Sequence, residues 1–433
     1  MRMSDKPLRV GLAGLGTVGA GLVKLLAENA ELVSRRANRP VVITAVSARD
    51  RTRDRGVDLS GFAWVDNAPD LALRDDVDAV VELIGGSNGP ALTLAKATLG
   101  AGKPLITANK AMLAHHGIEL AELAEKNNVA LKFEAAVAGG IPVIKGMREG
   151  LAGNRVEAVY GILNGTCNFI LSAMEREGKP FASVLKEAQS LGYAEADPTF
   201  DIDGIDAAHK LSILSSLAFG TKINFAGVST CGIRNVAPAD IDYARALGYR
   251  IRLIGTARLE DGKLFQRVHP CLVPETHPLA HVTDSLNAVV VEGNCVGQLV
   301  FQGRGAGEGP TASAVAADLI DVARGEWGPA LSMPAHLLTD TPAADPMKHI
   351  GRYYIRLTVV DRPGVLAELT AILRDLSVSV ESVIQRGSAP DGGVYFVLTT
   401  HDGPQQAISS ALERIGALES VTSAPVMMHI LDF

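Results

Sequence analysis

The chain has 433 residues, of which 47% are hydrophobic and 21% charged, and its formal net charge at pH 7 is -7. This length predicts two or three globular domains, and the acidic balance argues against a nucleic-acid partner, because a phosphate-binding protein usually carries a basic patch. No apolar run approaches the roughly 20 residues of a membrane span. The N-terminus shows no signal sequence and the cysteines form no C-x-x-C pair, so we expect a cytoplasmic protein without a zinc ribbon or disulfide framework.

Residues 1–140 alternate short apolar segments with helical ones. The strand-like segments are "LRVGLAG", "PVVITAVSA", "VDAVVELIG", "PLITAN" and "VALKFEAAV", and the helical ones include "TVGAGLVKLLAENAELV" and "ELAELAEKNN". Buried strands joined by helical crossovers form a mostly parallel, doubly wound sheet. The sequence therefore predicts an α/β protein with an N-terminal domain of the Rossmann type.

A glycine-rich turn follows the first predicted strand and opens the first predicted helix. Its sequence "GLGTVG" places Gly14, Gly16 and Gly19 in the pattern G-x-G-x-x-G, with Thr17 and Val18 between the last two. In this setting the glycines permit a tight turn, a close approach to a pyrophosphate and close helix packing. The alternative is a turn without a ligand, but the context favours a dinucleotide cofactor at the helix N-terminus.

Two further positions lie where the strands of such a sheet end. Arg49 follows the second strand and favours the 2′-phosphate of NADP, whereas Asp50 keeps NAD open and a solvated loop charge is the alternative for Arg49. Asn109 and Lys110 follow the strand at 105–108. A lysine there can neutralise a cofactor phosphate or a substrate carboxylate, and the alternative is a solvated lysine at a helix start.

The rest of the chain divides into two further domains. Residues 141–306 carry long segments with turns, such as "RIRLIGTARLEDGKLFQRVHPCLV", and predict an α+β domain for catalysis and dimerisation. We expect a helix within about 307–330 to complete the N-terminal domain. Residues 339–349 are proline-rich and predict a linker, and 350–433 follow the order β-α-β-β-α-β of a ferredoxin-like domain.

An acidic stretch, "EADPTFDIDGIDAAHK", lies within the middle domain. It resembles an EF-hand loop because Gly204 falls at the sixth position when Asp201 and Asp203 take the third and fifth. The twelfth position, however, is Lys210 in place of the bidentate glutamate that calcium requires. We therefore reject a calcium loop.

Asp206 and Lys210 lie one helical turn apart on an otherwise apolar helix. An exposed ion pair is the simple alternative. A buried lysine, in contrast, needs a partner, which Asp206 supplies. Such a lysine can donate a proton to a carbonyl oxygen during hydride transfer. Glu195, Asp197 and Asp201 could receive a substrate ammonium group, and we interpret His209 as a structural residue of the helix.

Together these segments closely resemble homoserine dehydrogenases over nearly the whole chain. The similarity rests on "GLGTVG", "TANK", "FEAAVAGGIP", "GILNGTCNFIL", "GYAEADPTFDIDGIDAAHKL" and "GRGAGEGPTASAVAADL", and "DRPGVLAEL" resembles the first turn of an ACT domain. The resemblance implies the reversible, NAD(P)H-dependent reduction of L-aspartate 4-semialdehyde to L-homoserine in threonine and methionine biosynthesis. It also implies a homodimer or homotetramer. The ACT-like domain suggests feedback, with threonine as the expected effector, and a dimerisation or purely structural module is the alternative.

The resemblance also assigns roles to individual positions. Lys210 would be the proton donor, with Asp206 as its partner. Substrate binding would involve Glu195, Asp201, Lys110, Gly165 and Thr166; cofactor binding would involve Gly14, Gly16, Thr17, Val18, Gly19, Arg49, Asn109, Lys110, Gly307 and Glu308. A monovalent cation such as sodium would be held by Glu134 and the carbonyl groups of Val137, Gly139 and Ile141.

Two other functions remain to be weighed. A 2-hydroxy-acid dehydrogenase with an ACT domain would have its glycine loop in mid-chain and a histidine base. Here the loop begins at Gly14, and no histidine lies in a comparable setting. A non-catalytic NADP-binding sensor would keep the glycine loop but would not need Asp206 and Lys210 one turn apart.

Overall fold

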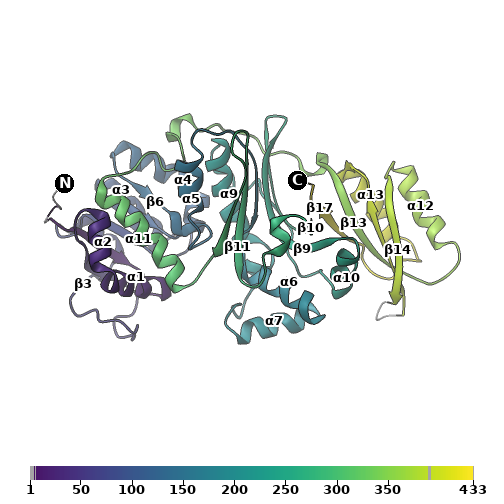
Figure 1. The fold of residues 1–433 in the computed structure, drawn as a ribbon, viewed down its shortest axis with the longest axis horizontal. Coiled ribbons are helices and arrows are strands. Elements are labelled where there is room, and N and C mark those ends of the chain that lie inside the picture. Colours follow the sequence, from purple (N-terminus) through teal and green to yellow (C-terminus); the bar gives the residue numbers. More distant parts are fainter. Residues whose placement is uncertain (1–3, 5, 389–391, 433) are drawn as a thin grey trace.

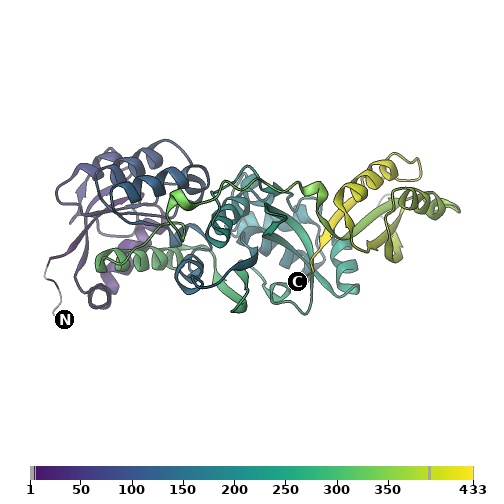
Figure 2. The same cartoon turned by 90° about the horizontal axis from the view of Figure 1, so that it is seen from above.

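The structure, a computed structural model, describes residue 4, residues 6–388 and residues 392–432. An N-terminal, a central and a C-terminal unit lie in a row along the long axis of the molecule, as Figure 1 and Figure 2 show from two directions. The central unit contains the helix with Asp206 and Lys210, so the two outer units contact it from opposite ends.

The N-terminal unit is a six-stranded parallel sheet with helices on both faces. Its strand order is β3-β2-β1-β4-β5-β6, which reverses direction beside β1. The elements are β1 (Leu8–Ala13), α1 (Thr17–Glu28), α2 (Ala30–Ala37), β2 (Val41–Ser47), β3 (Ala63–Trp64), β4 (Ala79–Glu82), α3 (Pro90–Gly100), β5 (Leu105–Thr107), α4 (Lys110–Lys126) and β6 (Leu131–Lys132). The predicted doubly wound sheet is therefore confirmed.

Both faces of this sheet are buried, which explains why its strands read as continuous apolar runs. Val80 packs with α3 and α4 on one face, and Val81 packs with α1 and α2 on the other. A helix from much later in the chain, α11 (Glu308–Arg324), lies beside α1 on that second face. Val315 and Leu319 of α11 are fully buried against this face and extend its apolar core.

Two predicted element boundaries were wrong. The segment 17–33 is not one helix, because α1 ends at Glu28 and α2 begins at Ala30 after a break at Asn29. The segment 129–137 forms a strand only at Leu131–Lys132, and Glu134–Ala136 is a 3-10 turn. At 129–137 the apolar character of the sequence predicted a longer strand than the two residues that pair in the sheet.

The central unit is built on antiparallel strands with helices packed against them. Its elements are α5 (Val143–Lys145), β7 (Val156–Ile162), α6 (Gly165–Glu177), α7 (Phe181–Ser190), α8 (Thr199–Ile202), α9 (Ile205–Phe219), β8 (Ser229–Thr230), α10 (Pro238–Ala246), β9 (Tyr249–Glu260), β10 (Lys263–Pro274), β11 (Leu286–Gly293) and β12 (Gly297–Arg304). The β9–β10 hairpin turns at Asp261 and Gly262, which have φ of 48° and 73°. Both positive values are typical of a tight hairpin turn, so this "DG" turn has the expected chemistry.

The C-terminal unit has the predicted β-α-β-β-α-β order. Its elements are β13 (Ile350–Val359), α12 (Val365–Asp375), β14 (Val380–Ser388), β15 (Val394–Thr400), the short β16 (Gly403–Pro404), α13 (Gln405–Gly416) and β17 (Val426–Ile430). The last strand, β17, pairs with β13 on one side and parallel with β10 on the other. One continuous sheet of 11 strands therefore runs through the central and C-terminal units.

The segment at 339–349, expected as a linker, lies against the central unit. The Lys222 amide donates to the carbonyl of Thr339, and the Leu264 amide donates to that of Pro342. In the part of the chain that the structure describes, no helix combines the length and the apolar character needed to cross a membrane.

Candidate active site

The glycine loop connects β1 to α1 at the point where the strand order reverses. Gly14 has φ of +98°, and a methyl group on it would lie 2.4 Å from the carbonyl oxygen of Leu83; one on Gly19 would lie 2.0 Å from the carbonyl oxygen of Gly14. A methyl group on Gly16, in contrast, would meet nothing within 4 Å. The loop is thus tight on its inner side and open on its outer side, where the N-terminus of α1 faces outward. This geometry fits a pyrophosphate.

The first turn of α1 continues this open side. Thr17 is exposed and Val18 is half-buried. Gly307 and Glu308 lie at the start of α11, and the Glu308 carboxylate accepts a hydrogen bond from Lys24 of α1 at 2.8 Å. Glu308 therefore lies against the middle of α1, at Gly21 and Lys24, whereas Thr17 and Val18 form its first turn.

The end of β2 carries several arginines close to the glycine loop. Arg49 is exposed, and Asp50 accepts hydrogen bonds from the backbone and hydroxyl groups of Thr52. Arg55 Nε donates to the carbonyl oxygen of Leu15 at 3.1 Å and so fixes this segment against the loop. The Asp50 carboxylate is thus hydrogen-bonded within its own loop, whereas the exposed Arg49 side chain can contact a ligand.

A buried carboxylate that the sequence did not indicate organises the ends of β4 and β5. Glu82 is fully buried and accepts hydrogen bonds from the Ile84 amide and from the Thr107 hydroxyl, at 2.7 and 2.5 Å. Thr107 in turn accepts from the Asn109 amide at 3.0 Å. Asn109 caps α4 through the Met112 amide, which places Lys110 at the first helical position.

Three charged side chains meet where the N-terminal and central units face each other. Lys210 Nζ lies 2.7 Å from Asp206 Oδ2, and Lys110 Nζ lies 3.0 Å from Asp206 Oδ1. Lys210 also donates to the carbonyl oxygen of Leu163 at 2.7 Å. Asp206 and Lys210 are 3% and 8% exposed, so this is a buried pair and not the solvated one considered above.

Asn164 holds the same carboxylate from a different direction, and the sequence did not single it out. Its side-chain amide donates to Asp206 and to Asp201, both at 2.8 Å. Its carbonyl oxygen accepts from the Cys167 amide and caps α6. The signal was present, because Asn164 directly precedes the expected substrate positions Gly165 and Thr166, and asparagine is a preferred helix cap.

The expected substrate residues surround this centre. Thr166 Oγ1 lies 3.4 Å from Asp201 and 2.8 Å from the carbonyl oxygen of Tyr193. Glu195 is exposed, and its charge acts on Lys110. Asp203, which had no role in the sequence interpretation, pairs with Arg234 at 2.6 Å instead of facing the centre.

The charges shift each other's proton affinities in a consistent way. Burial alone would raise the pKa of Asp206, but the ammonium groups of Lys210 and Lys110 lower it well below its usual range. Burial lowers the pKa of Lys210 and the charge of Lys110 adds to this effect, whereas Asp206 opposes it. Asp206 raises the pKa of Lys110 despite its burial. Burial and the neighbouring Asp206 raise the pKa of Asp201.

A cavity of about 500 Å³ opens beside these residues. Its walls include Gly86, Asn109, Lys110, Phe200 and His209, so both the N-terminal and central units line it. His209 is 4% exposed and stacks on Phe225 with ring centroids 4.2 Å apart. Burial lowers the pKa of His209 to about 4, which makes it a neutral wall of the cavity at neutral pH.

The expected cation site lies deeper in the protein. Glu134 is 3% exposed, and its carboxylate accepts the backbone amides of Ile144 and Lys145 at 2.9 and 2.8 Å. Burial, and then the charge of Asp318, raises the pKa of Glu134 to about 7. Gly139 has φ of +46°, which turns the backbone sharply at this point.

Val137 and Ile141 are also buried, so all four expected ligand positions lie in one enclosed turn. Among the described residues, the carbonyl groups of Val137 and Gly139 accept no hydrogen bond from another backbone amide outside helices and strands. The carbonyl oxygen of Ile141, in contrast, accepts the Val143 amide at 2.7 Å. A buried carboxylate beside the free carbonyl oxygens of Val137 and Gly139 is a donor set that hard monovalent cations accept. Among the described residues no three His, Cys, Asp or Glu side chains form a cluster that could hold a metal ion, and a carbonyl-rich site needs no such cluster.

Three family models match the chain. The model described as "Homoserine dehydrogenase, NAD binding domain" matches residues 14–134, "Homoserine dehydrogenase" matches residues 142–320 and "ACT domain" matches residues 353–420. Together they cover the glycine loop, the Asp206–Lys210 helix and the C-terminal unit.

Curated proteins and solved structures give the same result. Homoserine dehydrogenases from Neisseria gonorrhoeae and Pseudomonas aeruginosa are 46% and 44% identical to this chain, and each alignment covers 98% of this chain and 99% of the relative. A crystal structure of a homoserine dehydrogenase from Thiobacillus denitrificans has a TM-score of 0.93, 44% identity and 99% coverage of both chains. A hyperthermophilic archaeal homoserine dehydrogenase in complex with NADPH has a TM-score of 0.64 and 26% identity, and covers 75% of this chain and 100% of its own.

Proposed function

Because the chain belongs to the homoserine dehydrogenase family, and therefore catalyses the NAD(P)-dependent interconversion of L-aspartate 4-semialdehyde and L-homoserine, we propose that Lys210 is its proton donor. Family membership leaves no support for the 2-hydroxy-acid dehydrogenase or the non-catalytic sensor considered above. The observation that carries the proposal is the hydrogen bonding of Lys210 Nζ. Two of its three N–H groups are held by Leu163 and Asp206, which leaves one for the substrate.

The nicotinamide cofactor, when bound, supplies the hydride to the aldehyde carbon. The free N–H of Lys210 then donates to the aldehyde oxygen and gives it a proton as negative charge develops there. Asp206 orients Lys210 and keeps the ammonium form in place. Since Lys210 is buried, water does not compete strongly for this proton.

Lys210 is a better acid for this step than Lys110, the other lysine on Asp206. Burial lowers the pKa of Lys210, whereas Asp206 raises that of Lys110. A lower pKa makes proton donation to the developing alkoxide easier. Lys110 is half-buried at the mouth of the site, where it would neutralise the substrate carboxylate.

The substrate ammonium group would bind on the acidic side of the centre. Glu195 and Asp201 provide the negative charge, and Thr166 adds a hydroxyl group at the N-terminus of α6 beside Gly165. Burial raises the pKa of Asp201, and an arriving ammonium group would lower it again. The same carboxylate is held by Asn164, which we add as a positioning residue.

We assign NADP as the preferred cofactor. Arg49 is exposed at the end of β2, while Asp50 is engaged with Thr52, so a phosphate meets a free guanidinium there. The archaeal neighbour bound to NADPH is consistent with this preference. Asn109, Gly307 and Glu308 would border the nicotinamide end.

Glu134 and the carbonyl groups of Val137, Gly139 and Ile141 would bind a monovalent cation such as sodium, which would neutralise the buried carboxylate without a chemical role in hydride transfer. The C-terminal ACT domain would bind threonine as an effector. Homodimer or homotetramer formation and a cytoplasmic location stay predictions from the family resemblance.

The Lys210→Ala variant tests the catalytic assignment. We expect it to bind NADPH as the unmodified protein does, because Lys210 lies outside the glycine loop. Its turnover with L-aspartate 4-semialdehyde, followed by loss of NADPH absorbance, should fall by about 10²–10⁴-fold. Lys222→Ala, at a half-exposed lysine just after α9, is the matched control. A near-normal kcat for Lys210→Ala would rule out the proton-donor role.

A further inference from the structure

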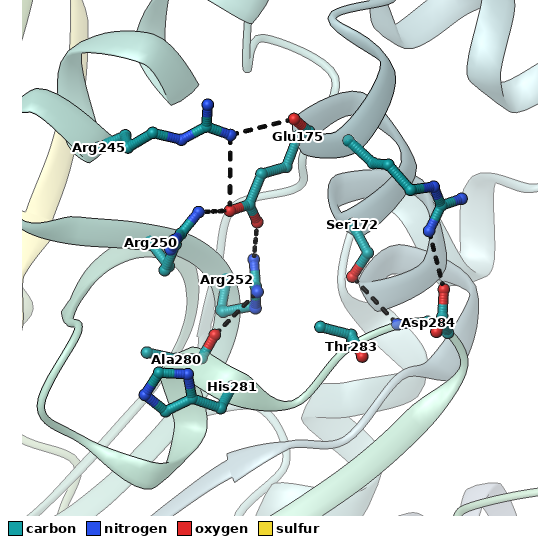
Figure 3. A pocket seen from close by; sticks show the side chains of 10 residues that line it. Ser172, Glu175, Arg245, Arg250, Arg252, Ala280, His281, Thr283 and Asp284 are labelled. Atoms are coloured by element: carbon teal, nitrogen blue, oxygen red, sulfur yellow. Dashed lines mark hydrogen bonds and ion pairs between the residues drawn. The ribbon is translucent and has the colours of Figure 1, made fainter.

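A second cavity lies in the central unit, between α6, β9 and the loop at 278–284. Its volume is about 360 Å³, at the lower end of the range for small-molecule sites. Four arginines and two carboxylates are among its lining residues, which include Glu175, Arg176, Arg245, Arg250, Arg252 and Asp284 (Figure 3). None of them belongs to the hydride-transfer site.

One carboxylate already occupies the space between three of these arginines. Glu175 accepts from Arg250 through Oε1 and from Arg252 through Oε2, the latter at 3.0 Å. Arg245 lies 3.9 Å from Oε1 and also donates to the Glu175 carbonyl oxygen. Figure 3 shows the three guanidinium groups converging on this carboxylate. An oxyanion is therefore the chemical group that this arrangement accommodates.

Arg252 is the most unusual member of the group. Only 2% exposed, it donates to Glu175, to the carbonyl oxygen of Ala280 and to its own preceding carbonyl, but its Nε has no partner in the described residues. Burial, and then the charge of Arg250, lowers the pKa of Arg252 to about 10. This Nε is itself buried, so it does not reach a ligand in the cavity, and Arg252 serves to hold Glu175 in place.

The lining guanidinium groups are not equally paired. Three of the four have a carboxylate within 3.3 Å: Arg176 pairs with Asp284 and Glu177, Arg250 with Glu175 and Glu275, and Arg252 with Glu175. Arg245, half exposed, has no carboxylate other than Glu175 within salt-bridge distance among the described residues.

We propose that this cavity binds a small oxyanion of the phosphate class, with Arg245 as its main ligand. Arg245 has the longest carboxylate contact of the four arginines, and a guanidinium group suits the several oxygens of such an anion. The hydroxyl groups of Ser172 and Thr283 line the same cavity and are further potential donors. The site is independent of the assignments made for Lys210 and the cofactor.

One continuous helix, α6, connects the cavity with the active site. Glu175 lies near the C-terminal end of α6, and Asn164, which holds Asp201 and Asp206, caps its N-terminal end. The two residues are separated by about 16 Å of one continuous helix.

Titration of the full chain with inorganic phosphate tests binding. Ionic strength is kept constant with chloride, and saturating NADPH blocks phosphate at the glycine loop. We expect a saturable rise in Tm and a single-site isotherm by calorimetry, with no comparable effect of chloride. Absence of saturable binding, or an equal response to chloride, would overturn the proposal.

Substitutions locate the binding. Arg245→Gln should weaken phosphate binding about 10-fold or more, since it removes one charge-assisted contact from a half-exposed position where folding is not at risk. Arg155→Gln, at an exposed arginine paired with Glu157, should bind as the unmodified chain does. Phosphate at the glycine loop would be unaffected by Arg245→Gln, so equal affinity of the two variants would refute the site.

For Glu175→Gln we expect tighter phosphate binding, in contrast to Arg245→Gln. This change removes the internal competitor and leaves three guanidinium groups with less negative charge. Phosphate should therefore bind at least several-fold more tightly and raise the Tm of the variant more than that of the unmodified chain. A purely structural role of Glu175 would lower the Tm without this gain, and weaker or unchanged phosphate binding would contradict the proposal.

Discussion

Lys110 and Lys210 bind opposite oxygens of one carboxylate, that of Asp206, although they come from different units of the protein. Lys110 starts α4 of the N-terminal unit, and Lys210 lies in α9 of the central unit. Asp206 therefore fixes the proton donor and also ties the cofactor-binding unit to the catalytic helix. Its negative charge is divided between two ammonium groups, which explains why burial still lowers the pKa of Lys210.

Asp206→Asn should reduce kcat and shift the pH profile. The amide keeps the shape of the side chain but no longer stabilises the protonated form of Lys210, so the pKa of Lys210 falls further. Reduction of the aldehyde needs protonated Lys210, and activity should therefore be lost at a lower pH than in the unmodified chain. We expect kcat near neutral pH to fall by about 10²-fold or more.

The measurement is kcat against pH in the direction of semialdehyde reduction. Asp203→Asn is the matched control, because Asp203 lies three residues away and pairs with the exposed Arg234 instead. If both variants keep the original profile, Asp206 does not control the protonation of Lys210.

The doubly wound sheet and the Asp206–Lys210 pair were predictable because their signals are local. Gly14 and Gly19 indicate a tight turn because they have no side chain. The i, i+4 spacing places Asp206 beside Lys210 on any helix. The C-terminal β-α-β-β-α-β order was predictable for the same reason, since each strand and helix has its own periodicity.

The features that could not be predicted depend on contacts between distant parts of the chain. The parallel pairing of β17 with β10 joins Cys271 to His429, and no periodicity within either strand reports it. Glu82 lies within the apolar segment "VDAVVELIG", yet it organises the Thr107–Asn109 turn. The arginine cavity likewise gathers α6, α10 and β9, whose proximity only the fold reveals.

Arg49→Ala tests the cofactor preference. Removing one exposed guanidinium from the 2′-phosphate should raise KM for NADPH about 10-fold and leave KM for NADH within about twofold. Arg53→Ala, four residues along the same exposed loop, is the control and should change neither value. Equal effects of Arg49→Ala on both cofactors would show that Arg49 does not contact the 2′-phosphate.

Glu134→Gln tests the cation site. The folded-state pKa of Glu134 is raised from 4.5 to about 7, so its contribution to stability is present below about pH 4.5 and is lost as the pH rises through 7. A monovalent cation would offset this loss where the carboxylate is ionised. The rise in Tm with sodium, compared with choline at the same concentration, should therefore be larger at about pH 8 than at about pH 6.

In Glu134→Gln the sodium-specific rise in Tm should disappear at both pH values, because the charge that attracts the cation is gone. Glu149→Gln, at an exposed glutamate in the segment just after α5, keeps the cation site and should respond as the unmodified chain does. A sodium effect that persists in Glu134→Gln would place the cation elsewhere.

A buried ion pair joins the ACT domain to the central unit. Asp240 of α10 is fully buried and accepts hydrogen bonds from Arg356 Nε at 2.6 Å and from the Tyr354 hydroxyl at 2.9 Å, both from β13. The Asp240 carboxylate also accepts the Ala237 amide at the start of α10. This contact, the β10–β17 pairing and the hydrogen bond between Arg267 and His429 are among the polar links through which an effector on the ACT domain would act.

Arg356→Met should destabilise the protein by about 3–5 kcal/mol, because it leaves the Asp240 carboxylate buried without a cation. The double variant Asp240→Asn/Arg356→Met removes the stranded charge as well and should recover part of that loss. Arg362→Met, at a half-exposed arginine 3.6 Å from Glu368 in the same domain, should change stability by less than about 1 kcal/mol. Calorimetric unfolding of the full-length variants measures these differences, with the ACT domain expected to unfold first in Arg356→Met. The same variant should lose inhibition by threonine, the effector proposed above, while keeping basal kcat, since Arg356 lies in β13 of the C-terminal unit and Lys210 in α9 of the central unit. Stability equal to that of Arg362→Met would mean that other contacts, among them the β10–β17 pairing and the Arg267–His429 hydrogen bond, hold the domains together.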